Sequence, residues 1–157
     1  MTDKPAIVLV HGFRGGAAHW AKVIPELHRR GFGSLHAVEN PLTSLADDAE
    51  RTRKMVRQID GPVLLVGHSY GGAVITEAGD LPNVAGLVYV AAFAPDAGES
   101  PGQLSQELPP TANERRMAER MKPRKVIELD AGHASLASQP APVAGLIEEA
   151  ALALSAP

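Results

Sequence analysis

Ser69 is the residue of this sequence best placed for covalent chemistry. It is the centre of the run 67–71, Gly-His-Ser-Tyr-Gly, which directly follows the apolar run 62–66. A serine at a sharp turn from strand to helix needs glycine two positions before and after it, because a Cβ there would strike the adjoining backbone. The helix-like residues 72–78 come next. The pattern predicts a nucleophile elbow that presents the Ser69 hydroxyl.

His133 is the residue that could activate this hydroxyl. A serine is a weak nucleophile without an adjacent base, and histidine titrates close enough to neutrality to take the proton and return it. Residues 125–130 predict a late strand, and Gly132 and His133 follow it in a loop. The sequence therefore predicts His133 as the general base.

Two backbone N–H groups could complete such a site. Acyl transfer passes through a tetrahedral intermediate, and its developing oxyanion needs N–H donors. One donor typically follows the nucleophile, and another comes from an early strand-to-helix loop. The apolar residues 6–10 predict a buried strand that opens into this loop at His11 and Gly12. The N–H groups of Phe13 and Tyr70 are therefore the predicted oxyanion hole.

With these motifs in order along the chain, the sequence resembles the α/β-hydrolase superfamily. More narrowly, it resembles the small serine esterases related to plant hydroxynitrile lyases and methyl esterases. The resemblance implies Ser69 as nucleophile, His133 as base, and a three-layer α/β/α fold. The residues that carry it are His11-Gly12-Phe13, Trp20 with Val23 and Leu27, the run 67–72, the run 87–96 and Gly132-His133.

One part of the family pattern is missing. Relatives place a helical cap and one more strand, whose end supplies the triad aspartate, between the region 93–96 and the helix before the histidine strand. This sequence has only residues 97–110 there, rich in Pro, Gly, Ser and Gln and without a strand-like apolar run. We therefore expect a reduced family core, with a Pro/Gly-rich linker at 97–110 in place of the cap.

Four possibilities exist for the carboxylate that would orient His133. Asp96 has the expected chain order and follows a predicted strand end, where some lipases of the superfamily carry their acid, but it could equally cap the turn at Pro95. Glu99 is the second candidate, in the same loop. Asp130 lies close before His133 and is better suited to capping its own loop. A Ser-His dyad without an acid is the fourth possibility, at a cost of up to about ten-thousandfold in rate.

Other site candidates are weaker. Gly12, Trp20 and His68 could line a substrate site, although Trp20 is predicted as core or as the floor of the site. Strand alternation predicts that His68 points away from the nucleophile. His11 is predicted to be structural. The remaining histidines show no metal-ligand spacing on one predicted face, so no metal site is expected.

Composition indicates a single globular domain over 1–157, with 45% hydrophobic and 21% charged residues. A net charge of −3 without a basic stripe argues against nucleic acid as a partner. The absence of cysteine excludes disulfides and thiolate catalysis. No apolar run approaches the roughly 18 residues that span a bilayer, so we expect a cytoplasmic protein without a membrane partner. A shortened core could expose enough apolar surface to favour a homodimer.

Strands and helices alternate along the chain, which predicts an α/β domain with a mostly parallel sheet of about five strands. The charged residues 48–57 are predicted to form the solvated face of a helix. The last strand would fill the place of the missing one, so the loop 132–138 must bring His133 back toward Ser69. The expected order of strands in the sheet is 34–39, 6–10, 62–66, 87–92 and 125–130. Helices are expected to start near Pro25, Leu45, Gly72, Thr111 and Pro142.

These features predict a serine hydrolase that cleaves small carboxylic esters through an acyl-enzyme at Ser69, with no cofactor. Without a cap the site should be shallow and open, which favours short activated esters. One alternative is a catalytically weak or inactive scaffold or small-molecule binder. Another is a lyase that splits a cyanohydrin-like C–C bond, but the family's lyases rely on a further lysine, and no lysine in a strand-end loop matches it.

Overall fold

The computed structural model describes residues 4–96, 99–107 and 110–155. These residues form a parallel sheet of four strands with helices packed around it. The strands are β1 (Ala6–Val10), β2 (Leu35–Val38), β3 (Val63–His68) and β4 (Val84–Val90), in the order β2-β1-β3-β4. The helices are the 3-10 turn η1 (Ala17–Trp20), α1 (Val23–Arg29), α2 (Leu45–Val56), α3 (Gly71–Ala78), α4 (Pro101–Glu107), α5 (Pro110–Met121), α6 (Ser135–Ser138) and α7 (Pro140–Leu154).

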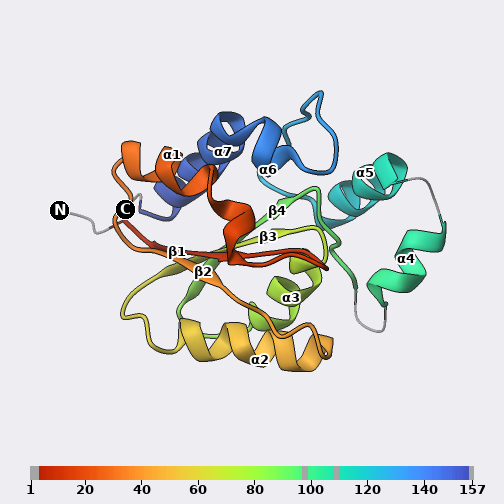
Figure 1. Cartoon of the computed structure of the whole chain (residues 1–157), viewed down its shortest axis with the longest axis horizontal. Coiled ribbons are helices and arrows are strands. Elements are labelled where there is room, and N and C mark those ends of the chain that lie inside the picture. The colour runs from red at the N-terminus through yellow and green to blue at the C-terminus, as the bar shows by residue number, and fades with distance from the viewer. Residues whose placement is uncertain (1–3, 97–98, 108–109, 156–157) are drawn as a thin grey trace.

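Helices cover both faces of the sheet (Figure 1). α1, α6 and α7 lie on one face, and α2 and α3 lie on the other. Along β1, Ile7 and Leu9 pack in the core with α1 and α7, while Val8 and Val10 pack in the core with α2 and α3. Because successive strand residues face opposite sides, a continuous apolar run supplies both cores. The predicted three-layer α/β/α fold is confirmed, as is the order of the first four strands.

The prediction of a fifth strand over Lys125–Asp130 is wrong. This segment forms no ladder with β4, and most of its residues are exposed. Two of its charged side chains pair instead with the helices on either side. Glu128 lies 3.0 Å from Arg115 of α5, and Lys125 pairs with Glu149 of α7. The segment is therefore attached to α5 and α7 rather than added to the sheet.

The linker predicted at 97–110 contains a helix, α4. The Gln103 N–H donates to the Ser100 hydroxyl at 3.2 Å, and the Ser100 N–H donates to the Gln103 side chain at 3.1 Å. This capping box, with Pro101 at the first helical position, starts the helix. Leu104 is buried in a small cluster with Met117 of α5. Residues 97–98 and 108–109 of the predicted linker lie outside the described residues.

A groove of about 750 Å³ runs along the edge of β4 that has no neighbouring strand. It is lined by β4, α5, α7 and the segment 123–132. Leu87 of β4 is 39% exposed and Val126 on the opposite wall is 57% exposed. The homodimer expected for a shortened core stays a prediction.

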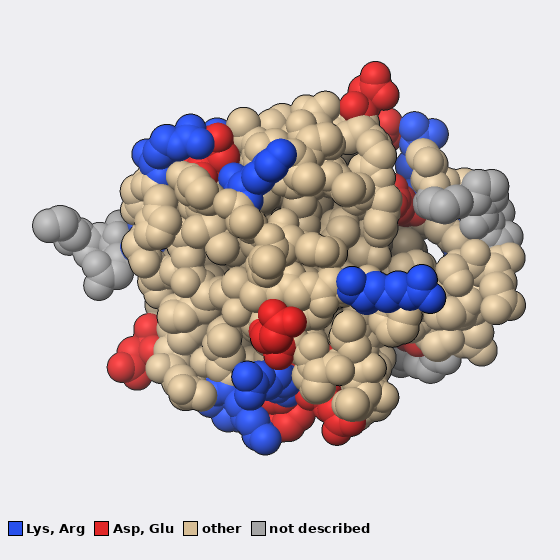
Figure 2. Space-filling model, viewed as in Figure 1, with Lys and Arg blue, Asp and Glu red and all other residues tan. Residues whose placement is uncertain are grey.

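The surface carries both signs of charge. Figure 2 shows acidic and basic side chains interspersed over the visible face, without a stripe of either sign. Among the described helices, none combines the length and the apolar composition that crossing a membrane would require.

We expect the backbone amides of residues 126–129 to exchange with solvent at least about a thousandfold faster than those of residues 64–66. The reason is that an exposed segment outside the sheet opens at almost no cost in free energy, whereas central-strand amides exchange only on large-scale unfolding. Hydrogen exchange followed by NMR or mass spectrometry measures both sets in one sample. Equal protection of the two sets would mean that the segment has joined the sheet.

Candidate active site

Ser69 lies on a strained bend between β3 and α3. Its φ is +55°, in the left-handed region that residues with a Cβ rarely adopt. The Ser69 N–H donates to the Val90 carbonyl at 3.2 Å, and the Ser69 carbonyl accepts from the N–H groups of Phe93 at 3.1 Å and Gly72 at 3.0 Å. The bend predicted for a nucleophile elbow is therefore present, and the end of β4 holds its backbone.

Two glycines let this bend close. A Cβ on Gly67 would lie 2.5 Å from the Gly71 carbonyl oxygen, and a Cβ on Gly71 would lie 2.4 Å from the Val10 carbonyl oxygen. Backbone oxygens cannot move aside as a flexible side chain can, so neither position accepts a larger residue. The close approach also sets the first turn of α3 against the end of β1. The N-terminus of α3, which is the positive end of its dipole, therefore lies at the bend.

The His133 imidazole meets the Ser69 hydroxyl across the site. The distance from His133 Nε2 to Ser69 Oγ is 2.8 Å, which is within the reach that a general base needs. Ser69 is half-buried, whereas His133 is exposed and lies on the irregular segment 122–134. The two side chains therefore come together although one is on the sheet and the other is on a surface segment.

The two predicted oxyanion residues lie beside this pair. The ring centroids of Phe13 and Tyr70 are 6.0 Å apart, with the rings edge to face. Among the described residues, neither backbone N–H donates a hydrogen bond. His11 fixes the loop: its Nε2 accepts from the Asn40 N–H at 3.0 Å, so its Nδ1 carries the proton and donates to the Gly12 carbonyl at 2.8 Å.

Asp48 anchors Tyr70, although residues 48–57 were expected to form a solvated face. Asp48 is completely buried and accepts hydrogen bonds from the Tyr70 hydroxyl at 2.7 Å and the Leu42 N–H at 2.8 Å. Burial, together with the hydrogen bond to Asp48, raises the pKa of Tyr70 and keeps its hydroxyl protonated. A charged residue in the first turn of a charged helix carries no sequence pattern that would indicate this role.

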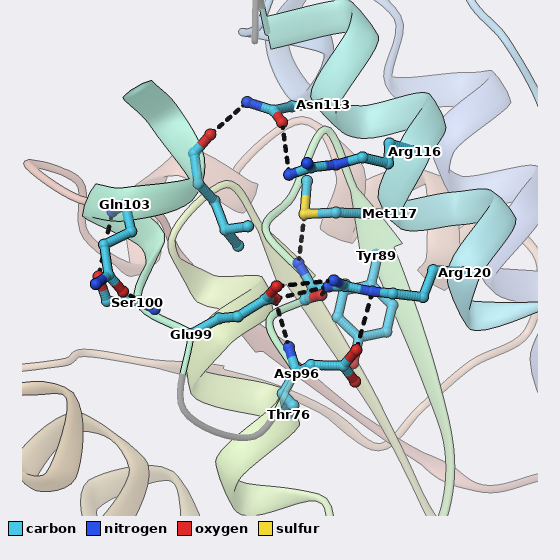
Figure 3. Close-up of polar contacts among 12 residues, drawn as sticks. Thr76, Tyr89, Asp96, Glu99, Ser100, Gln103, Asn113, Arg116, Met117 and Arg120 are labelled. Atoms are coloured by element: carbon cyan, nitrogen blue, oxygen red, sulfur yellow. Dashed lines mark hydrogen bonds and ion pairs between the residues drawn. The ribbon is translucent and has the colours of Figure 1, made fainter. Parts of the chain in front are cut away.

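Arg120 binds two of the three carboxylates that were candidates to orient His133 (Figure 3). Asp96 Oδ2 lies 3.2 Å from Arg120 Nε, and Glu99 accepts from both terminal guanidinium nitrogens at 2.8 and 2.9 Å. The hydrogen bonds from Arg120, with another from the Asp96 N–H, lower the pKa of Glu99. Asp130 is exposed. Within the described ranges, no hydrogen bond or ion pair joins any of the three carboxylates to His133, because Arg120 satisfies the first two and Asp130 faces solvent.

The three residues predicted to line a substrate site have different positions. A Cβ on Gly12 would lie 2.9 Å from Ser69 Cβ, so this glycine lies directly against the nucleophile. Trp20 is completely buried in the core with α1 and α7. His68 is 6% exposed, and its Nε2 lies 2.8 Å from the His133 carbonyl oxygen. Its side chain contacts the base, which strand alternation did not indicate.

The site thus holds a hydroxyl, an imidazole in contact with it, and two unengaged N–H groups beside them. This set suits attack on a carbonyl carbon and stabilisation of the oxyanion that results. Within the part of the chain that the structure describes, no group of three or more side chains could hold a metal ion.

The sequence pattern of the alpha/beta hydrolase family matches residues 7–113. The chain belongs to the α/β hydrolase family. The matched part includes Ser69, Gly12 and the two residues predicted to form the oxyanion hole, and His133 lies beyond it. Among α/β hydrolases the chain is related to the methylesterases.

Three curated relatives illustrate this relationship. An α/β hydrolase of Aspergillus novofumigatus is 34% identical over 127 residues, covering 68% of this chain and 50% of the relative. Methylesterase 7 of Arabidopsis thaliana is 34% identical over 122 residues, covering 68% and 46%. A carbendazim-hydrolysing esterase of a Nocardioides species is 33% identical over 117 residues, covering 66% and 48%. The chain therefore spans about half the length of the curated relatives it matches.

Solved structures show the same fold. A pyrethroid hydrolase from Sphingobium faniae superposes with a TM-score of 0.76 at 20% identity, over 95% of this chain and 98% of that one. Tomato methylketone synthase I superposes with a TM-score of 0.79 at 14% identity, over 97% and 99%.

We expect Gly12→Ala to slow the reaction of Ser69 with a fluorophosphonate by about a hundredfold, because a new Cβ 2.9 Å from Ser69 Cβ would displace the nucleophile. Labelling rates measured at several probe concentrations give the effect. Gly33→Ala is the matched control, because no atom lies within 4 Å of a Cβ there. Equal rates in the two variants would show that Gly12 does not need to be a glycine.

Proposed function

We propose that the protein is a serine esterase that cleaves small carboxylic esters through an acyl-enzyme at Ser69. The observation that carries this proposal is the 2.8 Å contact between His133 Nε2 and Ser69 Oγ on a bend with φ of +55°. The names of the relatives support the ester class, since two of them are methylesterases and another is an esterase that hydrolyses carbendazim.

The first half of the reaction forms the acyl-enzyme. Ser69 Oγ attacks the ester carbonyl carbon while His133 Nε2 takes the hydroxyl proton. The carbonyl oxygen becomes an oxyanion, which the N–H groups of Phe13 and Tyr70 stabilise with help from the dipole of α3. The intermediate then collapses, the C–O bond to the alcohol breaks, and His133 gives its proton to the departing alkoxide. The products of this step are the acyl-Ser69 ester and a free alcohol.

Water completes the cycle by the same route. His133 takes a proton from water, the hydroxide adds to the acyl carbon, and the oxyanion again forms beside Phe13 and Tyr70. Collapse breaks the bond to Ser69 Oγ, and the proton returns from His133 to Ser69. Because no carboxylate pairs with His133 in the described residues, the imidazolium lacks a counterion. Esters with good leaving groups are therefore the favoured substrates.

Labelling by a fluorophosphonate tests the proposal. We expect wild-type protein to react stoichiometrically at Ser69, Ser69→Ala to give no adduct, and His133→Ala to react at least about a hundredfold more slowly, because general-base assistance is worth that much. Intact-mass and peptide mass spectrometry measure the adduct and its site.

Matched controls use residues of the same types elsewhere. Ser105→Ala, on the exposed face of α4, and His28→Ala, on the exposed face of α1, should both label as wild type does. A wild-type protein that forms no adduct would refute the esterase proposal and favour an inactive scaffold. Release of cyanide from a cyanohydrin, with no hydrolysis of p-nitrophenyl acetate, would favour the lyase instead.

A further inference from the structure

His133 lies on an irregular segment that is anchored on both sides of it. Gln139 donates to the Asp130 carbonyl at 3.1 Å, and Leu136 is buried in the core. Residues 130–134 are all exposed, and the segment 122–134 has no regular secondary structure. Within the described residues, the imidazole of His133 hydrogen-bonds only to Ser69. Keeping one rotamer and one loop conformation costs conformational entropy, and a misplacement of about 1 Å in a reacting group can cost a hundredfold in rate. Since no carboxylate among the described residues bonds to His133, its orientation depends on other contacts.

His68 makes the contacts that fix it. The His68 side chain is buried at the end of β3, directly before the nucleophile, and its Nε2 lies 2.8 Å from the His133 carbonyl oxygen. The two imidazole rings also lie against each other, with centroids 4.9 Å apart and planes inclined by 38°. One contact restrains the backbone of His133, and the other restrains its ring.

The tautomer of His68 follows from its partner. A carbonyl oxygen can only accept a hydrogen bond, so the Nε2 of His68 carries a proton. Nδ1 is buried without a hydrogen-bond partner among the described residues. Burial lowers the pKa of His68 and outweighs the hydrogen bond to the His133 carbonyl, which acts in the opposite direction. His68 is therefore a neutral donor, which orients its partner without supplying a negative charge.

We propose that His68 is the positioning residue of this site and performs the orienting task that a triad carboxylate performs elsewhere. It does so through the main chain of His133 and the face of its ring, rather than through Nδ1. This inference rests on the proposed esterase function for its effect on rate. The positioning of the His133 imidazole on Ser69 by His68 does not require that the protein turns over a substrate.

Amide substitutions at position 68 test the proposal. In His68→Gln the side-chain amide can replace Nε2 as donor to the His133 carbonyl, whereas in His68→Asn the shorter amide falls short of it. We expect His68→Asn and His68→Leu to lower kcat for p-nitrophenyl acetate by about tenfold to a hundredfold with little change in KM, and His68→Gln to retain most of the wild-type kcat. His28→Gln, on an exposed helix face, is the matched control and should behave as wild type.

NMR supplies a readout that does not need activity. With labelled histidines, we expect a nuclear Overhauser effect between the His133 ring and Ser69 in wild type and His68→Gln, and its loss in His68→Asn. Thermal unfolding identifies variants that do not fold. If His68→Leu is one of them, the comparison of His68→Gln with His68→Asn decides the test. Equal kcat and equal Overhauser effects in the Gln and Asn variants would overturn the proposal. An inert wild type whose Overhauser effect is lost only in His68→Asn would refute the esterase function and support the positioning role.

Discussion

The hydrogen bond between Ser69 Oγ and His133 Nε2 joins a rigid part of the molecule to a loose one. The Ser69 bend is fixed by hydrogen bonds to the end of β4 and by close glycine contacts with β1. His133 belongs to an exposed segment without regular structure. The catalytic geometry therefore depends on how firmly that segment is attached to the sheet. His68, the last residue of the strand before Ser69, contributes to this attachment through the contact of its Nε2 with the His133 carbonyl oxygen at 2.8 Å.

Charge distinguishes this site from a complete triad. In the proposed reaction, the Ser69 proton moves to His133 and an imidazolium forms, which a triad carboxylate would stabilise. Here Arg120 pairs with Asp96 and Glu99, and the neighbour of the imidazole is a neutral histidine. In the proposed reaction, the N–H groups of Phe13 and Tyr70 and the N-terminus of α3 would stabilise the oxyanion. In the proposed reaction, the arrangement would therefore compensate only one of the two charges.

Sequence patterns of a few consecutive residues predicted those features of the site that depend on neighbouring residues alone. The elbow at Ser69 follows from glycine spacing after a buried strand, and the sheet order follows from four apolar runs and right-handed crossovers. The prediction of a fifth strand over 125–130 was wrong because a short run with apolar residues shows that a segment could form a strand, not that it pairs with one. The helix at Pro101 was missed because its capping box lies among loop-forming residues. The burial of Asp48 depends on the Tyr70 hydroxyl, a distant partner in the sequence.

The most direct measurement is the rate of Ser69 acylation by p-nitrophenyl acetate in Asp96→Asn protein. Asp96 has the chain order of a triad acid, yet its carboxylate lies 3.2 Å from Arg120 and not on His133. If the serine and the histidine act as a dyad, the acylation rate of the variant equals that of wild type. A fall approaching ten-thousandfold, about the loss that follows removal of a triad carboxylate, would show that Asp96 orients His133 and would contradict the dyad.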